Sequence, residues 1–112
     1  MASDNEFVDF VLEMLSRLGG VRAKAMFGGH GIYYEGIMVG LIVGDVFYLK
    51  VDDQNWPTFE KAGSRPFSYR RKNAKKPVQL SYWEVPPFLF DDRDQLCDWA
   101  LRSHAAAIRS RQ

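Results

Sequence analysis

The strongest constraint on the fold is a two-residue hydrophobic period that runs from residue 21 to residue 51. This is the period of β-strands. The pairs Glu35-Gly36 and Gly44-Asp45 interrupt it and suit two-residue hairpin connections, with glycine in the first position favouring a type II′ turn. The segment IMVGLIV (37–43) has no polar side chain, which indicates a central strand covered on both faces or nearly so. The sequence therefore predicts an antiparallel meander.

A helix is expected on each side of this meander. Residues 4–18 show the i, i+3, i+4, i+7 spacing of one apolar helical face, after a capping box of Ser3 and Glu6 and before a Gly19-Gly20 stop. Residues 91–109 predict a second helix, because aspartates crowd its start and arginines lie towards its end, as the helix dipole favours.

The segment between the meander and the last helix predicts a short helix and a hairpin. VDDQNWPTFEKAG reads as a helix capped by Asn55 or Asp52, with Pro57 in its first turn and Gly63 as its end. The strands FSYRR and PVQLSYWEV follow, and prolines close the second.

These elements follow the order α-βββ(β)-α-ββ-α and predict a single domain over residues 1–112. The class is α+β, with an antiparallel sheet of about five strands and the N- and C-terminal helices packed on it in two layers. We expect the following residues to be mostly buried: Phe10, Met14, Leu41, Leu49, Leu80 and Trp99. The inner face of the last helix should consist of Leu96, Trp99, Ala100, Ser103 and Ala107.

Composition indicates a globular domain. Hydrophobic residues make up 46% and charged residues 26% of 112 residues, which is ordinary for a folded chain. The acidic start MASDNE lacks the features of a signal peptide, and the longest apolar run, 36–44, is too short to span a bilayer. Cys97 is the one cysteine, so no intrachain disulfide can form. A cytoplasmic location and no membrane contact are expected.

The segment MFGGHGIYYEG (26–36) holds four glycines in eleven positions. It departs from the dinucleotide fingerprint at Tyr34, and from the phosphate-binding loop at Ile37-Met38. A strand follows the glycines, so no helix N-terminus is available there for a phosphate. The favoured interpretation is architectural, as a strand bend or bulge. The alternative is a small-ligand or enzyme site that uses His30, Tyr33 and Tyr34.

No catalytic constellation emerges from the remaining reactive residues. Cys97 lies seven residues before His104, or about 10 Å along a helix, so the two cannot form a local nucleophile–base pair. Cys97 is therefore expected to be a buried, unreactive thiol. Two histidines and scattered carboxylates give no metal-ligand spacing. We expect no catalytic residues, no metal, no cofactor and no enzymatic activity.

The segment RPFSYRRKNAKK (65–76) holds six of the fifteen basic residues and no acid. Basic side chains with nearby aromatic rings suit nucleic-acid binding through phosphate charge and base stacking. The candidate contacts to nucleic acid or a partner are Arg70, Arg71, Lys72, Lys75, Lys76, Tyr82 and Trp83. The alternative, favoured because the whole chain is near neutrality, is a solvated loop that protects a sheet edge.

Three segments together resemble a known family. MFGGHGIYYEGIMVGLIVGDVFYLKVDD, NWPTFEKAGSRPFSY and KPVQLSYWEVP are similar to the N-terminal domain of the TfoX/Sxy competence regulators, and the likeness runs from about residue 9 to residue 101. The resemblance implies a two-layer domain with an antiparallel sheet. It also implies a non-enzymatic accessory role in transcription of DNA-uptake genes, with protein partners of the transcription machinery such as the catabolite activator protein. It supplies no catalytic or ligand residues. Direct contact with DNA is expected to be weak.

Overall fold

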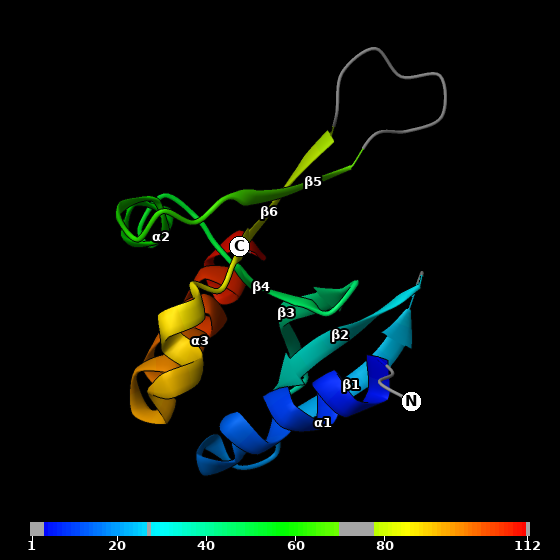
Figure 1. The fold of residues 1–112 in the computed structure, drawn as a ribbon. Helices are drawn as coiled ribbons and strands as arrows, with labels where there is room; N and C mark the ends of the chain where they lie inside the picture. The colour runs from blue at the N-terminus through cyan, green and yellow to red at the C-terminus, as the bar shows by residue number, and fades with distance from the viewer. Residues whose placement is uncertain (1–3, 27, 70–77, 112) are drawn as a thin grey trace.

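The computed structural model describes residues 4–26, 28–69 and 78–111, and they form an α+β domain of two layers (Figure 1). The described strands make one antiparallel sheet in the order β1-β2-β3-β4-β6-β5. The elements in chain order are α1 (Asp4–Met14), η1 (Ser16–Leu18), β1 (Arg22–Met26), β2 (Gly29–Tyr34), β3 (Ile37–Val43), β4 (Val46–Lys50), α2 (Trp56–Lys61), β5 (Pro66–Tyr69), β6 (Val78–Glu84), η2 (Pro87–Asp91) and α3 (Arg93–Ser110). The predicted class and element order are confirmed.

The sheet has six strands where about five were expected, because the segment before the glycines forms a strand of its own. β1 pairs with β2 from Arg22 opposite Tyr33 to Met26 opposite Gly29. The hairpins on either side of β3 have two-residue connections, as predicted, but they are not type II′ turns. Glu35 (φ 52°), Gly36 (φ 78°), Gly44 (φ 57°) and Asp45 (φ 62°) all have positive φ. Positive φ at both central residues defines type I′, whose twist matches that of the flanking strands.

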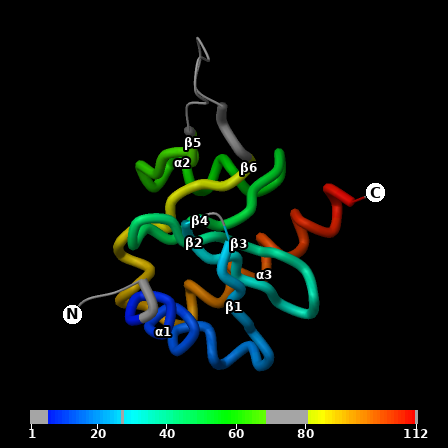
Figure 2. The backbone as a smooth tube through the Cα atoms, turned by 90° about the vertical axis from the view of Figure 1, so that its right-hand side faces the viewer, coloured from blue at the N-terminus to red at the C-terminus, as the bar shows by residue number. Residues whose placement is uncertain are grey.

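The core lies between one face of the sheet and the helices. α3 contacts β3 and β4, while α1 packs on β1 and α3, and α2 lies against β6. Fully buried side chains from both layers meet here, namely Val11, Leu15, Ile32, Ile42, Phe47, Leu49, Phe59, Leu89 and Leu96. β5 and β6 lie at the end of the molecule opposite α1 (Figures 1 and 2).

Most of the predicted core is confirmed, but Phe10 is not part of it. Met14, Leu49 and Trp99 are buried in it, and the whole predicted inner face of α3 is buried as well. Leu41 is buried as predicted, but it lies opposite Gly31 on the other face of the sheet. Phe10 is 42% exposed. The inward stripe of α1 is centred on Val11, and one residue turns a helix by about 100°, so Phe10 faces away from the sheet. The side chain of Leu80 lies outside the described part of the chain.

The helix ends differ from the prediction in detail. α1 ends at Met14, and the predicted last turn is the separate 3-10 turn η1, followed by Gly19 (φ 75°) and Gly20 (φ 78°). α3 begins at Arg93 rather than 91, because Asp92 caps it by accepting a hydrogen bond of 3.1 Å from the Gln95 amide. The predicted cap partner Ser3 lies outside the described residues.

Asn55, one of the two predicted caps, occupies the N-cap position of α2, but its side chain makes no capping hydrogen bond. Asp52 and Asn55 stabilise the preceding turn instead. Asn55 Oδ1 accepts a bond of 2.7 Å from the Asp52 amide, and Asn55 Nδ2 donates to the Lys50 carbonyl at 3.1 Å. The Asp52 carboxylate accepts two bonds from Arg109, from Nε at 2.5 Å and from a terminal nitrogen at 3.0 Å. This bidentate pair joins the turn after β4 to the last turn of α3. Hydrogen bonds from Arg109, opposed in part by burial, hold the pKa of Asp52 below its usual value.

The Asp52–Arg109 pair gives a testable pH dependence. A lowered folded-state pKa contributes stability that is present above the unfolded pKa of about 3.9 and is lost as the pH falls through the folded-state value. We expect Asp52→Asn to lower the free energy of unfolding at pH 7, and we expect its difference from wild type to shrink below about pH 4. Urea titrations of both proteins across this range measure it, with Asp53→Asn as the control. A difference that stays constant down to about pH 2.5 would contradict the assignment.

Candidate functional site

The glycines of residues 26–36 allow strands to approach closely. A Cβ on Gly29 would stand 2.3 Å from the Ile42 carbonyl oxygen of the neighbouring strand. Gly28 has φ 77° in the β1–β2 connection. The pairing of β2 with β3 shifts register between Ile32 and Tyr33, which is a β-bulge. These observations support the architectural interpretation of the segment.

The side chains proposed as ligands in this segment lie on different faces of the sheet. Tyr34 faces the helices, where its ring meets His104 of α3 edge-on at 5.0 Å between centroids. His30 lies opposite Ile42 and Ala25, on the same helix-facing side as buried Ile32. Tyr33 points to the opposite face, over Gly31. The structure therefore does not bring His30, Tyr33 and Tyr34 together, and a ligand role for them stays a prediction.

Cys97 is buried between α3 and α1. Its exposed fraction is 5%, and its Sγ lies 3.6 Å from the Met14 carbonyl oxygen, which can accept the S–H. Burial raises the pKa of the thiol, and Arg17 and Arg93 only partly oppose this shift. The reactive thiolate is therefore disfavoured at neutral pH.

We expect a thiol reagent to modify Cys97 slowly in the folded protein and rapidly in denaturant. Burial blocks access, and the raised pKa keeps the sulfur protonated. Absorbance of a released chromophore follows the reaction, and a free cysteine at the same pH serves as the reference. Native labelling as fast as the reference would show that the thiol is accessible and activated.

The basic candidates Arg70, Arg71, Lys72, Lys75 and Lys76 lie outside the described residues, between β5 and β6. Tyr82 and Trp83 are described, and they lie on opposite faces of β6. Trp83 is opposite core residue Leu49 and stacks on Trp56 of α2, with 6.0 Å between ring centroids. Tyr82 is opposite Lys50 and faces away from the helices. Tyr82 and Trp83 therefore cannot contact one ligand on one face.

The sheet face opposite the helices carries basic, aromatic and methionine side chains. Successive residues of a strand point to opposite faces, so Tyr33 beside core residue Ile32 and Lys50 beside core residue Leu49 face outward. Arg22 and Met38 are opposite Tyr33, Lys24 is opposite Gly31, and Tyr82 is opposite Lys50, so they lie on the same face. We call this surface the open face and define it by Arg22, Lys24, Tyr33, Met38, Lys50 and Tyr82. Arg22 and Lys24 are exposed, and the other four are partly exposed.

Two lysines stand over two tyrosine rings of the open face. Lys24 Nζ lies 5.8 Å from the centroid of the Tyr33 ring, and Lys50 Nζ lies 5.2 Å from that of Tyr82. Both distances are within the range of cation–π attraction. Burial raises the pKa of Tyr82, and electrostatic interaction with Tyr33 on the same face raises it further.

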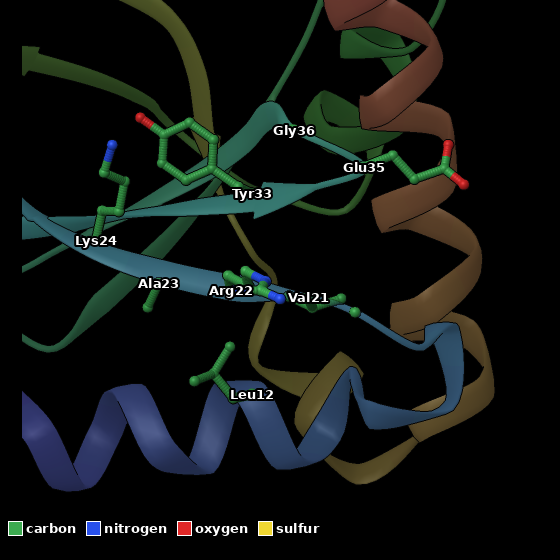
Figure 3. A pocket seen from close by; sticks show the side chains of 9 residues that line it. Leu12, Val21, Arg22, Ala23, Lys24, Tyr33, Glu35 and Gly36 are labelled. Carbon is green, nitrogen blue, oxygen red and sulfur yellow. The ribbon is translucent and has the colours of Figure 1, made fainter.

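Two shallow depressions border these lysine–tyrosine pairs. The larger, of about 850 Å³, lies at the β1 edge, and Lys24 and Tyr33 stand side by side in it (Figure 3). The second, of about 400 Å³, lies between the sheet and the end of α3, where Met38, Lys50 and Tyr82 meet Ala107, Ser110 and Arg111. Each depression thus combines a tyrosine ring with cationic groups.

Apolar and aromatic side chains pack together on the open face around Gly31. The position of a Cβ on Gly31 is 3.0 Å from the Tyr33 ring, 3.1 Å from Met26 Sδ and 3.3 Å from Met38 Sδ. Farther along the sheet, the Tyr48 and Phe67 rings meet edge-on at 4.8 Å. Glu84, an acid on this face, is opposite Tyr48. Burial first, and then Glu84, raises the pKa of Tyr48.

A second surface cluster consists of phenylalanines on α1 and η2. The rings of Phe7, Phe10 and Phe90 have centroids 5.7–6.2 Å apart. Phe88, which is 47% exposed, meets Trp99 edge-on at 6.1 Å. We call Phe7, Phe10 and Phe90, together with Phe88 of the same turn η2, the phenylalanine cluster.

Sequence reasoning missed the open face and the phenylalanine cluster. The alternation of Arg22 and Lys24 with alanines in VRAKAM was a usable signal, because it places both cations on one face of a strand. The meeting of Lys50 with Tyr82 had no such signal, since the two residues come from distant parts of the chain.

Within the described ranges, no three His, Cys, Asp or Glu side chains are placed to hold a metal ion. The helices of the same ranges include none that is long and apolar enough to cross a bilayer.

Comparison with known proteins gives one clear result. A search among curated proteins finds no match. The model of the family described as TfoX N-terminal domain matches residues 13–107, which is nearly the whole chain and includes both layers of the fold. The chain therefore belongs to the TfoX N-terminal domain family.

Proposed function

We propose that this chain is a non-enzymatic regulatory domain that acts on the transcription of competence genes by contacting a protein of the transcription machinery. Membership of the TfoX N-terminal domain family supports a competence-related regulatory role. The family is not known for catalysis, which supports a role in binding. A cytoplasmic location fits this proposal.

The observation that carries the contact with a protein is the phenylalanine cluster. Phe10 and Phe88 expose 42% and 47% of their surfaces, although phenylalanine is among the residues most often buried. Aromatic side chains are enriched in protein interfaces and dominate their binding energies. The rings of Phe7, Phe10 and Phe90 pack on one another, and the ring of Phe88 packs on Trp99, so they are held in place before a partner arrives. Such preorganisation lowers the entropic cost of association.

A genetic experiment tests both parts of the proposal. The gene is deleted in the cells that encode it, and transcripts of DNA-uptake genes are measured after complementation with wild type, with Phe10→Ser/Phe88→Ser, or with Leu101→Ser. Leu101 is a matched control because it is 42% exposed but lies on α3, outside the cluster. Thermal unfolding confirms that each variant is folded.

We expect deletion to lower the transcripts, and we expect wild type and Leu101→Ser to restore them while the double variant does not. Unchanged transcripts after deletion would exclude the role in competence. Full restoration by the double variant would exclude the phenylalanine cluster as the contact surface.

A further inference from the structure

The open face has the composition of a nucleic-acid surface in a chain that is close to neutral. Its cations include Arg22, Lys24 and Lys50, and among the residues of the described strands Glu84 is the one acid. Glu35 borders the larger depression, but its side chain points away from Lys24 and Tyr33, towards α3 (Figure 3). Its Oε1 lies 3.8 Å from Nε2 of His104 on α3. The face is therefore locally positive, although the formal net charge of the chain is +1.

The cations and rings alternate across the strands. Lys24 is on β1, Tyr33 on β2, Met38 on β3, Lys50 on β4 and Tyr82 on β6, and these strands are successive neighbours in the sheet. With strands about 4.8 Å apart, the row spans roughly 19 Å, enough for several nucleotides of an extended single strand.

We infer that the open face binds single-stranded nucleic acid, with phosphates at Arg22, Lys24 and Lys50 and bases stacked on Tyr33 and Tyr82. Each lysine lies next to a tyrosine ring, with Nζ at 5.8 or 5.2 Å from the ring centroid. When the flexible lysine moves from the ring onto a phosphate, it frees the ring face for the base of the same nucleotide. Base–aromatic stacking and phosphate neutralisation are the two terms that hold single strands on protein surfaces. The side chains of Met26 and Met38 add a polarisable apolar contact surface beside Tyr33.

The geometry favours a single strand over a duplex. Reading a duplex requires an element that enters a groove, whereas the rings of the open face belong to strands inside a sheet. Bases are available for stacking on side chains only where they are unpaired. The row of rings would add nothing to the binding of paired DNA.

Binding is measured by fluorescence anisotropy with a labelled oligothymidylate of about twelve nucleotides, from low to physiological salt. The variants are Lys24→Gln/Lys50→Gln, Tyr33→Ala, Tyr82→Ala and Tyr33→Phe. Lys61→Gln is the charge control, because Lys61 is exposed on α2, away from the open face. A further variant neutralises the five cations between residues 70 and 76, and an unlabelled duplex serves as competitor.

We expect wild type to bind the oligonucleotide and the duplex to compete poorly. The lysine double variant should reduce the slope of log K against log salt by about 1.4, since each lost single-strand phosphate contact removes about 0.7. Each tyrosine-to-alanine change should weaken binding about tenfold, whereas Tyr33→Phe keeps the ring and should stay within about twofold of wild type. Lys61→Gln should leave affinity and slope unchanged.

Several outcomes would overturn the inference. These are no binding at low salt, equal affinity for duplex, or an effect confined to the variant of residues 70–76. Thermal unfolding checks that the tyrosine variants are folded, and retained affinity in a folded Tyr82→Ala protein would also exclude the surface. These results do not depend on transcript levels, so this inference and the proposed role in transcription can fail separately.

Discussion

Leu49→Ala is expected to lower the free energy of unfolding by about 2–5 kcal/mol. Leu49 has an exposed fraction of 0% and lies on β4, paired with Gly40 of β3 and Trp83 of β6. Truncation removes buried methyl groups and leaves a cavity, because two strands and the helix layer surround the site and cannot collapse fully into it.

Urea unfolding followed by tryptophan fluorescence measures the effect of Leu49→Ala. Leu101→Ala is the control, since its side chain is 42% exposed, and it should change the free energy of unfolding by no more than about 0.5 kcal/mol. A loss below about 1 kcal/mol for Leu49→Ala would mean that the β4 side chain is not enclosed as the structure shows.

Gly29→Ala is expected to destabilise the fold by about 3 kcal/mol, at the upper end of the usual cost of overpacking. The added Cβ would be 2.3 Å from the Ile42 carbonyl oxygen and 3.2 Å from Val43 Cγ2. The close atom belongs to the backbone of the adjacent strand, so relief requires β2 and β3 to separate and their hydrogen bonds to weaken.

Gly31→Ala is the matched control for this substitution. Its Cβ would meet the Tyr33 ring at 3.0 Å and two methionine sulfurs at 3.1 and 3.3 Å. These are ends of flexible side chains rather than backbone atoms and can move aside, so we expect a loss of less than about 1 kcal/mol, below the usual cost of overpacking. Thermal and urea unfolding of both variants compare them. An equal loss for both would show that strand approach at Gly29 is not the limiting contact.

The two proposed surfaces belong to different parts of the molecule. The phenylalanine cluster comes from α1 and η2, whereas the open face comes from strands on the other side of the sheet. A domain with both surfaces can contact a protein and a nucleic-acid strand at the same time. Substitutions in one surface should therefore leave binding at the other unchanged, because no described contact joins their residues directly.

Local patterns were sufficient to predict the elements and the class of the fold. The two-residue period, the Glu35-Gly36 and Gly44-Asp45 pairs and the spacing within 91–109 predicted the central hairpins and the inner face of α3 correctly. These features succeed because hairpin connections and helix faces depend on residues that are close in the chain. The family likeness was also readable from the segments that surround these turns.

Positions that depend on neighbours from elsewhere in the chain were not predictable in this way. Periodicity placed Phe10 in the core, but packing centred the buried stripe of α1 on Val11 and left Phe10 at the surface. The same limit applies to Asp52, whose carboxylate binds Arg109 of α3 rather than an adjacent helix end.

The open face shows the limit most clearly. The alternation around Lys24 indicates which side of β1 it occupies, but the row from Lys24 to Tyr82 exists only because β6 pairs with β4. Strand order is set by the burial of apolar area over the whole sheet, a long-range effect that no short window of sequence contains. Sequence patterns thus determined the strands, helices and turns of this domain, while the assembly of the sheet decided which side chains share a surface.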